Sequence, residues 1–180
     1  TGCDIAIASE GSFGPHPAVI FAHADEEYLV FVDKKNGLEI VEKELSLETN
    51  FNGAYVSNLV ELNDFAKSAN FPSHGLILRK NQDSLIDIVK GIDTWEVLEE
   101  TFNRFYDEVG KAFVETDMRA MYNPMRMKVI ELATQKLITK INSCCPNCET
   151  PGFGVTEVKT GLPCKQCLYP TKSTLSWVYQ

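Results

Sequence analysis

The chain has 180 residues and a formal net charge of −8 at pH 7, with 44% hydrophobic and 23% charged residues, as is ordinary for a soluble globular protein. No apolar run approaches the length of a membrane span and no signal-peptide pattern opens the chain, so we expect a cytoplasmic protein without a membrane partner. Residues 141–180 hold three lysines and two glutamates, which leaves about −9 on residues 1–140 and disfavours nucleic acid as a partner.

The first third of the chain predicts a run of strands. Residues 3–8 read as a buried strand that includes Cys3, and a polar loop with two glycines and two prolines follows over 9–17. Further strands are expected over 17–23 and 28–33, and Asn36-Gly37 predicts a hairpin turn into a strand over 38–45. Because natural domains rarely begin inside a core strand, we expect an upstream N-terminal segment to be missing.

The rest of the body alternates helices with strands. Asn58 and Glu61 form a capping-box pattern at the start of a helix, and Gly110 predicts the end of another. The expected elements are helices over 59–69, 84–90, 95–109 and 124–141, and strands over 76–79 and 112–115. The core-facing stripe of the last helix is predicted to be Met127, Ile130, Thr134, Leu137 and Ile141. The pattern predicts an α/β fold, a mixed sheet flanked by helices, over residues 1–142.

Four cysteines near the C-terminus predict a metal site. Cys145 and Cys148 form one CxxC pair, fifteen residues follow, and Cys164 and Cys167 form a second pair. Two such turns can supply four thiolates in the tetrahedral arrangement that a structural Zn²⁺ accepts. We therefore expect a small zinc ribbon over residues 143–180, with two disulfides as the alternative.

The polar loop after the first strand is a candidate ligand site, because open α/β sheets bind ligands beyond the carboxyl ends of their strands. Glu10 could hold a divalent metal, Ser12 could donate to a phosphate, and His16 could act as acid, base or ligand. A rigid polar turn is the alternative. His74, in a second polar segment, reads equally well as a ligand-binding or a structural histidine.

A third polar segment precedes the last helix. Glu115 and Asp117 leave a strand close together, as suits a shared Mg²⁺. Asn123 caps the helix, whose first turn attracts anions, and Arg119 and Arg126 add positive charge there. These residues predict an anion pocket, with a surface cluster of salt bridges as the alternative.

Four stretches together resemble one uncharacterised bacterial family, a domain of unknown function with a zinc-ribbon tail. They are IASEGSFGPHP (7–17), FPSHGLILRK (71–80), ETDMRAMYNPMRM (115–127) and the ribbon CPNCETPGF…GLPCKQC. The resemblance covers essentially the whole chain. It implies no established activity.

A more distant resemblance links CDIAIASEGSFG, and the order of residues 115–126 before a helix, to the inosine triphosphate pyrophosphatase superfamily. That superfamily places Mg²⁺ with an acidic, glycine-containing loop and contacts the purine with an arginine at the start of a C-terminal helix. The resemblance implies an inosine triphosphatase-like fold, with Glu10 as the acidic residue and Arg126 as the arginine. The superfamily's N-terminal phosphate loop, with its Asn and Lys, is absent here.

The leading prediction is a Mg²⁺-dependent nucleotide-binding domain, with nucleoside-triphosphate pyrophosphatase activity as its candidate reaction. Glu10, Glu115 and Asp117 would be its metal-binding and catalytic carboxylates. Its ligand-binding residues would be Ser12, His16, His74, Arg119, Asn123 and Arg126. The alternative is a non-enzymatic module that uses the ribbon to bind a protein partner; a third interpretation makes the ribbon a lid or a brace for a homo-oligomer.

Overall fold

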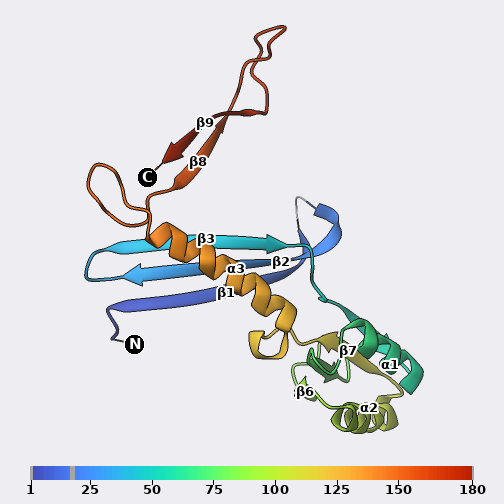
Figure 1. Ribbon diagram of the computed structural model, residues 1–180. Coiled ribbons are helices and arrows are strands. Elements are labelled where there is room, and N and C mark those ends of the chain that lie inside the picture. Colours follow the sequence, from blue (N-terminus) through green and yellow to red (C-terminus); the bar gives the residue numbers. More distant parts are fainter. Residues whose placement is uncertain (1, 17–18, 180) are drawn as a thin grey trace. The chain divides into compact units, whose positions relative to one another are not determined.

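The computed structural model describes residues 2–16 and 19–179, and it leaves out the side chains of residues 16 and 19–21. The described elements are β1 (Ile5–His16), β2 (Val19–Asp33), β3 (Leu38–Ser46), β4 (Gly53–Val56), α1 (Leu59–Ser68), β5 (Leu76–Arg79), β6 (Ile88–Ile92), α2 (Trp95–Val109), β7 (Ala112–Thr116), the 3₁₀ turn η1 (Ala120–Tyr122), α3 (Pro124–Ile141), β8 (Val155–Thr160) and β9 (Thr174–Tyr179). Helices and strands are thus mixed, as predicted (Figure 1).

The described strands form three sheets, ordered β1-β2-β3, β4-β7-β5-β6 and β8-β9. In the four-stranded sheet, β7 pairs antiparallel with both β4 and β5, and β5 pairs antiparallel with β6. The chain divides into two compact units. Unit 1 contains residues 1–9, 28–43 and 133–180, and unit 2 contains residues 10–27 and 44–132.

The core of unit 2 lies between the four-stranded sheet and helices α1 and α2, which lie beside it in Figure 1. Capping sets the helix ends as predicted. The Asn58 side chain accepts from the Glu61 amide at 2.9 Å, and the Glu61 carboxylate accepts from the Ser57 amide at 2.7 Å. Helix α2 begins after Thr94 and ends at Gly110, whose φ of 70° is left-handed.

The core of unit 1 forms where the C-terminal half of α3 packs on β2 and β3. Leu29 and Ile40 of the sheet are buried together with Ala133 and Leu137 of the helix. Figure 1 shows α3 lying across these strands. The predicted hairpin is confirmed, because β3 begins at Leu38 directly after Gly37, whose φ is 65°.

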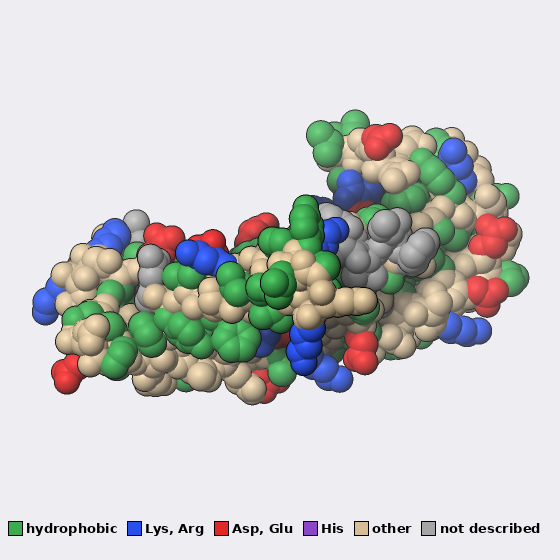
Figure 2. Space-filling model, turned by 90° about the horizontal axis from the view of Figure 1, so that it is seen from above, with side chains coloured by type: hydrophobic (Ala, Val, Ile, Leu, Met, Phe, Trp, Pro, Cys, Tyr) green, Lys and Arg blue, Asp and Glu red, His purple; other side chains and the backbone are tan. Residues whose placement is uncertain are grey.

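The β8–β9 hairpin of unit 1 has little core of its own. Every residue of β8 is exposed, and Trp177 and Leu175 of β9 are 61% and 53% exposed. Figure 2 shows hydrophobic side chains exposed among charged ones on the face seen there. The hairpin therefore presents apolar surface that the described residues leave uncovered.

The predicted loop over 9–17 is wrong, because β1 continues from Ile5 to His16. The predicted burial of the first strand is also wrong. Cys3 is exposed, and Ile5 and Ile7 are 59% and 66% exposed. β1 is an edge strand, and a short apolar run cannot distinguish an edge strand from a central one. Likewise the strands expected over 17–23 and 28–33 are one strand, β2, from residue 19 to residue 33; residues 17 and 18 lie outside the described residues.

Two further expectations fail because of tertiary contacts, and one strand was not expected. Residues 88–92 form strand β6 and not a helix, because pairing with β5 stabilises this β-branched stretch. Strand β4 is not among the expected elements. In α3, Leu137 is buried as predicted. The buried residues before it are Val129 and Ala133, each of which directly precedes a residue predicted to be buried, Ile130 or Thr134.

None of the described helices is long and apolar enough to cross a membrane. The predicted boundary between an α/β domain over 1–142 and a ribbon over 143–180 stays a prediction, because the two compact units follow contacts in space and not this division.

Candidate functional site

Arg126, in the first turn of α3, is the cation at the centre of the candidate site. Its Nε and Nη2 donate to the two carboxylate oxygens of Glu27, at 2.5 and 3.3 Å, and its Nη1 donates to the Met118 carbonyl at 2.7 Å. The guanidinium lies 5.0 Å from the ring centroid of Phe13. Glu27 is fully buried, so salt screens this ion pair weakly.

Gly11 of β1 leaves the space that this ion pair occupies. A Cβ at this position would lie 2.5 Å from Oε1 of Glu27, 2.6 Å from Nη2 of Arg126 and 2.8 Å from the Phe13 ring. No side chain fits there without displacing the pair. The requirement for glycine here is one of space.

Asp25 lies beside Glu27 on β2 and is only 1% exposed. Burial raises its pKa to about 7, and the charge and hydrogen bond of Glu27 add to this effect while Arg126 opposes it. Its Oδ1 has no hydrogen-bond partner among the described residues. Below pH 7 Asp25 is therefore mainly protonated and donates to Glu27, and the Glu27–Arg126 pair is balanced in charge.

The structure separates Glu10 and Ser12 from Arg126. Gly11 faces Arg126, and successive residues of a strand point to opposite faces, so Glu10 and Ser12 lie on the other face of β1. Both side chains are exposed. The side chain of His16 lies outside the described residues.

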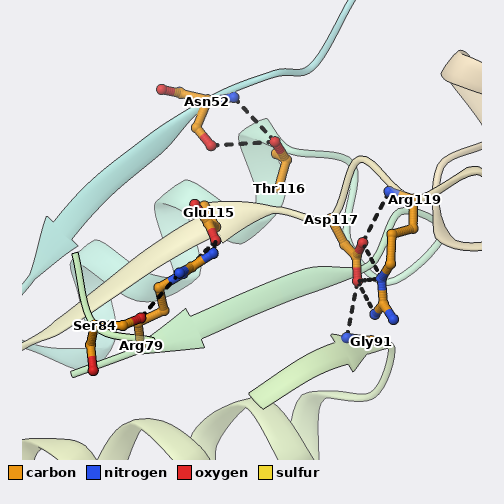
Figure 3. A network of polar contacts seen from close by, with 8 residues as sticks. All are labelled: Asn52, Arg79, Ser84, Gly91, Glu115, Thr116, Asp117 and Arg119. Atoms are coloured by element: carbon orange, nitrogen blue, oxygen red, sulfur yellow. Dashed lines mark hydrogen bonds and ion pairs between the residues drawn. The ribbon is translucent and has the colours of Figure 1, made fainter. Parts of the chain in front are cut away.

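Glu115 and Asp117 lie close in the chain as predicted, but each already pairs with an arginine (Figure 3). Glu115 Oε1 accepts from Nε and Nη2 of Arg79 at 2.7 and 2.6 Å. Asp117 is fully buried and accepts from the side chain and backbone of Arg119 and from the Gly91 amide at 3.0 Å. Asp117 thereby anchors the backbone of β6 as well as Arg119.

His74 and Asn123 close the first turn of α3. The Met125 amide donates to Nε2 of His74 at 3.3 Å, and the Arg126 amide donates to Oδ1 of Asn123 at 3.1 Å. Burial lowers the pKa of His74, so its neutral form is favoured and Nε2 can accept. These amides, to which an anion was expected to bind, already donate within the chain.

A pocket of about 320 Å³ opens beside Arg126 within unit 2. Its aromatic wall contains Phe13 and Phe51, whose ring centroids lie 6.2 Å apart. Its polar wall contains Lys90, Glu115, Asp117, Arg119 and Arg126. The structure thus brings four of the predicted site residues, Glu115, Asp117, Arg119 and Arg126, to one cavity.

The two CxxC segments fold as matching turns, which we call the first knuckle (residues 144–151) and the second knuckle (residues 163–170). In the first, the Glu149 amide donates to the Cys145 carbonyl; in the second, the Leu168 amide donates to the Cys164 carbonyl, both at 2.9 Å. Glu149 and Leu168 have left-handed φ values of 58° and 61°. The same backbone path is therefore used twice.

Each knuckle favours thiolates. The Thr150 hydroxyl, 3.2 Å from the Cys148 sulfur, lowers the pKa of that thiol. The amides of Cys167 and Gln166 lower the pKa of Cys164. Nevertheless, no three His, Cys, Asp or Glu side chains among the described residues are grouped as a metal site would require. The structure pairs Cys145 with Cys148 and Cys164 with Cys167, and it does not group all four.

Sequence reasoning missed Asp25, Glu27 and Lys90. The first two fell in the gap between two expected strands, although they are two residues apart and would share one face of a continuous strand. Lys90 fell in a segment expected to be helical.

Comparison with family models shows that the chain belongs to a family described as a domain of unknown function, DUF6671, whose model matches residues 1–180. Comparison with curated proteins finds no match, and comparison with solved structures finds none. The predicted membership of an uncharacterised family is thus confirmed. The zinc ribbon and the likeness to inosine triphosphate pyrophosphatases stay predictions.

Proposed function

We propose that the pocket beside Arg126 binds a small anion that carries a planar apolar group, such as a nucleotide. Its composition supports this: Phe13 and Phe51 offer aromatic surface, and Lys90 offers positive charge in the same cavity. Stacking of a base on an aromatic side chain contributes about 1–3 kcal/mol.

The main support for the proposal is the positive charge of Lys90 in this pocket. Arg119 is paired with Asp117, and Arg126 with Glu27, so these cations are already neutralised. Among the described residues, no hydrogen bond or ion pair engages the Lys90 amine. The pocket therefore has one uncompensated positive charge in a chain of net charge −8, which favours an anion there.

We further propose hydrolysis of nucleoside triphosphates with Mg²⁺ as the reaction. The predicted carboxylate ligands, however, are not arranged to bind the metal together. Asp117 is held by Arg119, Glu115 is held by Arg79, and Glu10 lies on the outer face of β1. We therefore derive no catalytic step through Mg²⁺. Turnover, the inosine triphosphatase-like fold and the cytoplasmic location stay predictions.

Calorimetric titration with ATP, ITP and pyrophosphate tests the pocket. Lys90→Gln should weaken binding of all three at least tenfold, about 1.4 kcal/mol, because each loses the same cation. Phe51→Ala should weaken binding of the nucleotides and spare pyrophosphate, which has no base to stack. Lys159→Gln, an exposed change on β8, is the matched control. Equal binding by the native chain and Lys90→Gln would refute the site.

The same panel with added Mg²⁺ tests hydrolysis through the release of pyrophosphate. Glu115→Gln and Glu10→Gln should both abolish release if these carboxylates serve the metal. Binding without release would keep the pocket and remove the enzymatic proposal.

A second function, binding of a protein partner through the ribbon, is supported by exposed aromatic side chains. Tyr169 is 75% exposed and Trp177 is 61% exposed, and such residues are enriched at protein interfaces. Phe153 is half-buried and stacks on Tyr179 at 5.6 Å, so it contributes less surface.

Parallel affinity captures with the native chain and with the Tyr169→Ser, Trp177→Ser variant test this function. A partner retained by the native chain and lost by the variant would support it. Identical captures from both baits would contradict it.

A further inference from the structure

A row of side chains from three neighbouring strands lines the pocket beside α3. Ile77 of β5 pairs with Glu115 of β7, and on its other side β5 pairs with the irregular stretch of β6 that contains Lys90. Lys90, Ile77 and Glu115 all line the pocket. Neighbouring strands lie about 4.8 Å apart, so two strand spacings, roughly 10 Å, separate the backbones that carry Lys90 and Glu115. The phosphates and the base of one nucleotide can therefore meet different residues of this row.

Glu115 has one carboxylate oxygen that no described residue engages. Arg79 donates to Glu115 through Nε and Nη2, at 2.7 and 2.6 Å, and both contacts reach Oε1 (Figure 3). The Ser84 carbonyl accepts from Nη1 of Arg79 at 3.2 Å, which helps to fix the guanidinium. The Glu115 side chain is 26% exposed and lines the pocket, so Oε2 is available to a ligand there.

The two ends of the row favour different parts of a nucleotide. Lys90 offers a positive charge that no described residue pairs with, and this charge attracts phosphate. Carboxylate and phosphate oxygens are both acceptors when ionised, so Oε2 of Glu115 does not bond to a phosphate but can accept from an N–H group of a base. We therefore expect the phosphates beside Lys90 and the edge of the base beside Glu115.

The bases differ in the donors that they present to a carboxylate. Guanine carries two adjacent donor groups, N1–H and the 2-amino group, with no acceptor between them. In adenine and cytosine the amino group lies next to a ring nitrogen that is an acceptor, and in uracil the N–H group lies between two carbonyl oxygens. A carboxylate repels these neighbouring acceptors, so guanine matches Glu115 best.

We propose that Glu115 is a specificity-determining residue and that the pocket selects guanine nucleotides. The inference rests on the proposed function, because it needs a nucleotide in this pocket. Oε1 of Glu115 stays with Arg79, and Oε2 accepts from guanine while the base stacks on the aromatic wall of Phe13 and Phe51. Reading of a base edge by a well-placed side chain favours the matching base by about fivefold to 150-fold.

Calorimetric titration of the native chain without added metal, using GTP, ITP, ATP and N1-methyl-GTP, tests the ligand side. ITP lacks the 2-amino group, and in N1-methyl-GTP a methyl group replaces the N1 proton. GTP should bind at least about fivefold more tightly than each of the other three. Equal binding of GTP and ATP would overturn the base specificity. This comparison needs no variant, so it decides the question even where a substitution at Glu115 prevents folding.

Glu115→Gln tests the protein side. The amide oxygen of this variant can still accept from Arg79, but the amide nitrogen that replaces Oε2 is a donor and repels the donors of guanine. The ratio of the GTP and ATP affinities should fall at least about fivefold. The ratio is the readout because a general change in the charge of the pocket affects both nucleotides alike. A ratio that stays at the native value would overturn the role of Glu115.

Glu108→Gln is the matched control, because Glu108 also pairs with a cation, Lys80, but does not line the pocket. It should leave the ratio unchanged. Pyrophosphate separates failure of this inference from failure of the proposed function, since it has no base to recognise. Binding of pyrophosphate together with equal binding of all four nucleotides would overturn the guanine specificity alone. Failure of pyrophosphate and of every nucleotide to bind would overturn both proposals.

Discussion

Replacement of Asp25 by asparagine should alter the pH dependence of stability in a defined direction. The pKa of Asp25 is raised from 3.8 to about 7, chiefly by burial. Between pH 3.8 and about pH 7, the Asp25 carboxyl is ionised in the unfolded chain and protonated in the folded chain. The unfolded state therefore binds fewer protons in this range. The stability from Asp25 is therefore complete below about pH 4, declines as the pH rises, and is lost above pH 7.

The magnitude follows from the size of the shift. A difference of about three pKa units corresponds to about 4 kcal/mol, at about 1.4 kcal/mol per unit. The amide introduced by Asp25→Asn would stay neutral at every pH and donate to Glu27 as the protonated carboxyl does. The variant should match the native chain near pH 4 and exceed its free energy of unfolding by up to about 4 kcal/mol at pH 8.

Urea unfolding at pH 4, 5, 6, 7 and 8, followed by tryptophan fluorescence with Trp177 replaced by Phe in every variant so that only Trp95 reports, measures this difference within the same unit. Trp95 packs against the core of unit 2, to which Asp25 belongs. Asp64→Asn makes the same chemical change at an exposed position of α1 and is the control. A difference between Asp25→Asn and the native chain that stays constant from pH 4 to 8 would refute the reasoning.

Two further predictions concern packing and capping. Gly11→Ala should destabilise the chain by about 1–3 kcal/mol in urea unfolding and weaken anion binding, because its Cβ would displace Glu27 and Arg126; Gly154→Ala, whose nearest neighbour is 3.4 Å away, is the control, and equal stabilities would count against the account. Asn58→Ala should cost about 1 kcal/mol through loss of the cap on α1, and Asn58→Ser should restore most of it; an alanine variant as stable as the native chain would contradict the capping role.

Local chemistry determined much of the fold in advance. The caps at Asn58 and Asn123 and the glycine at 110 act within a few residues, so the starts of α1 and α3 and the end of α2 followed from the sequence. The hairpin turn at Asn36-Gly37 also followed from the sequence, because its backbone conformation depends on these two residues. The alternation of helices and strands therefore predicted a mixed α/β chain, and four sequence motifs predicted its family.

Only the tertiary structure decided which polar residues share a site. Glu27 and Arg126 are 99 residues apart in sequence, and their ion pair depends on the space at Gly11, which no local pattern encodes. Residues 88–92 became a strand because β5 pairs with them, and that pairing places Lys90 at the pocket.

The same distinction holds for the cysteines. The CxxC spacing by itself determined each knuckle, because a turn of a few residues sets its own hydrogen bonds. Whether the two knuckles meet depends on the register of β8 and β9, which places them at opposite ends of the hairpin. Hydrogen bonds within a short turn depend on neighbouring residues and can be predicted from the sequence. Contacts between side chains that are distant in the sequence depend on how the whole chain packs.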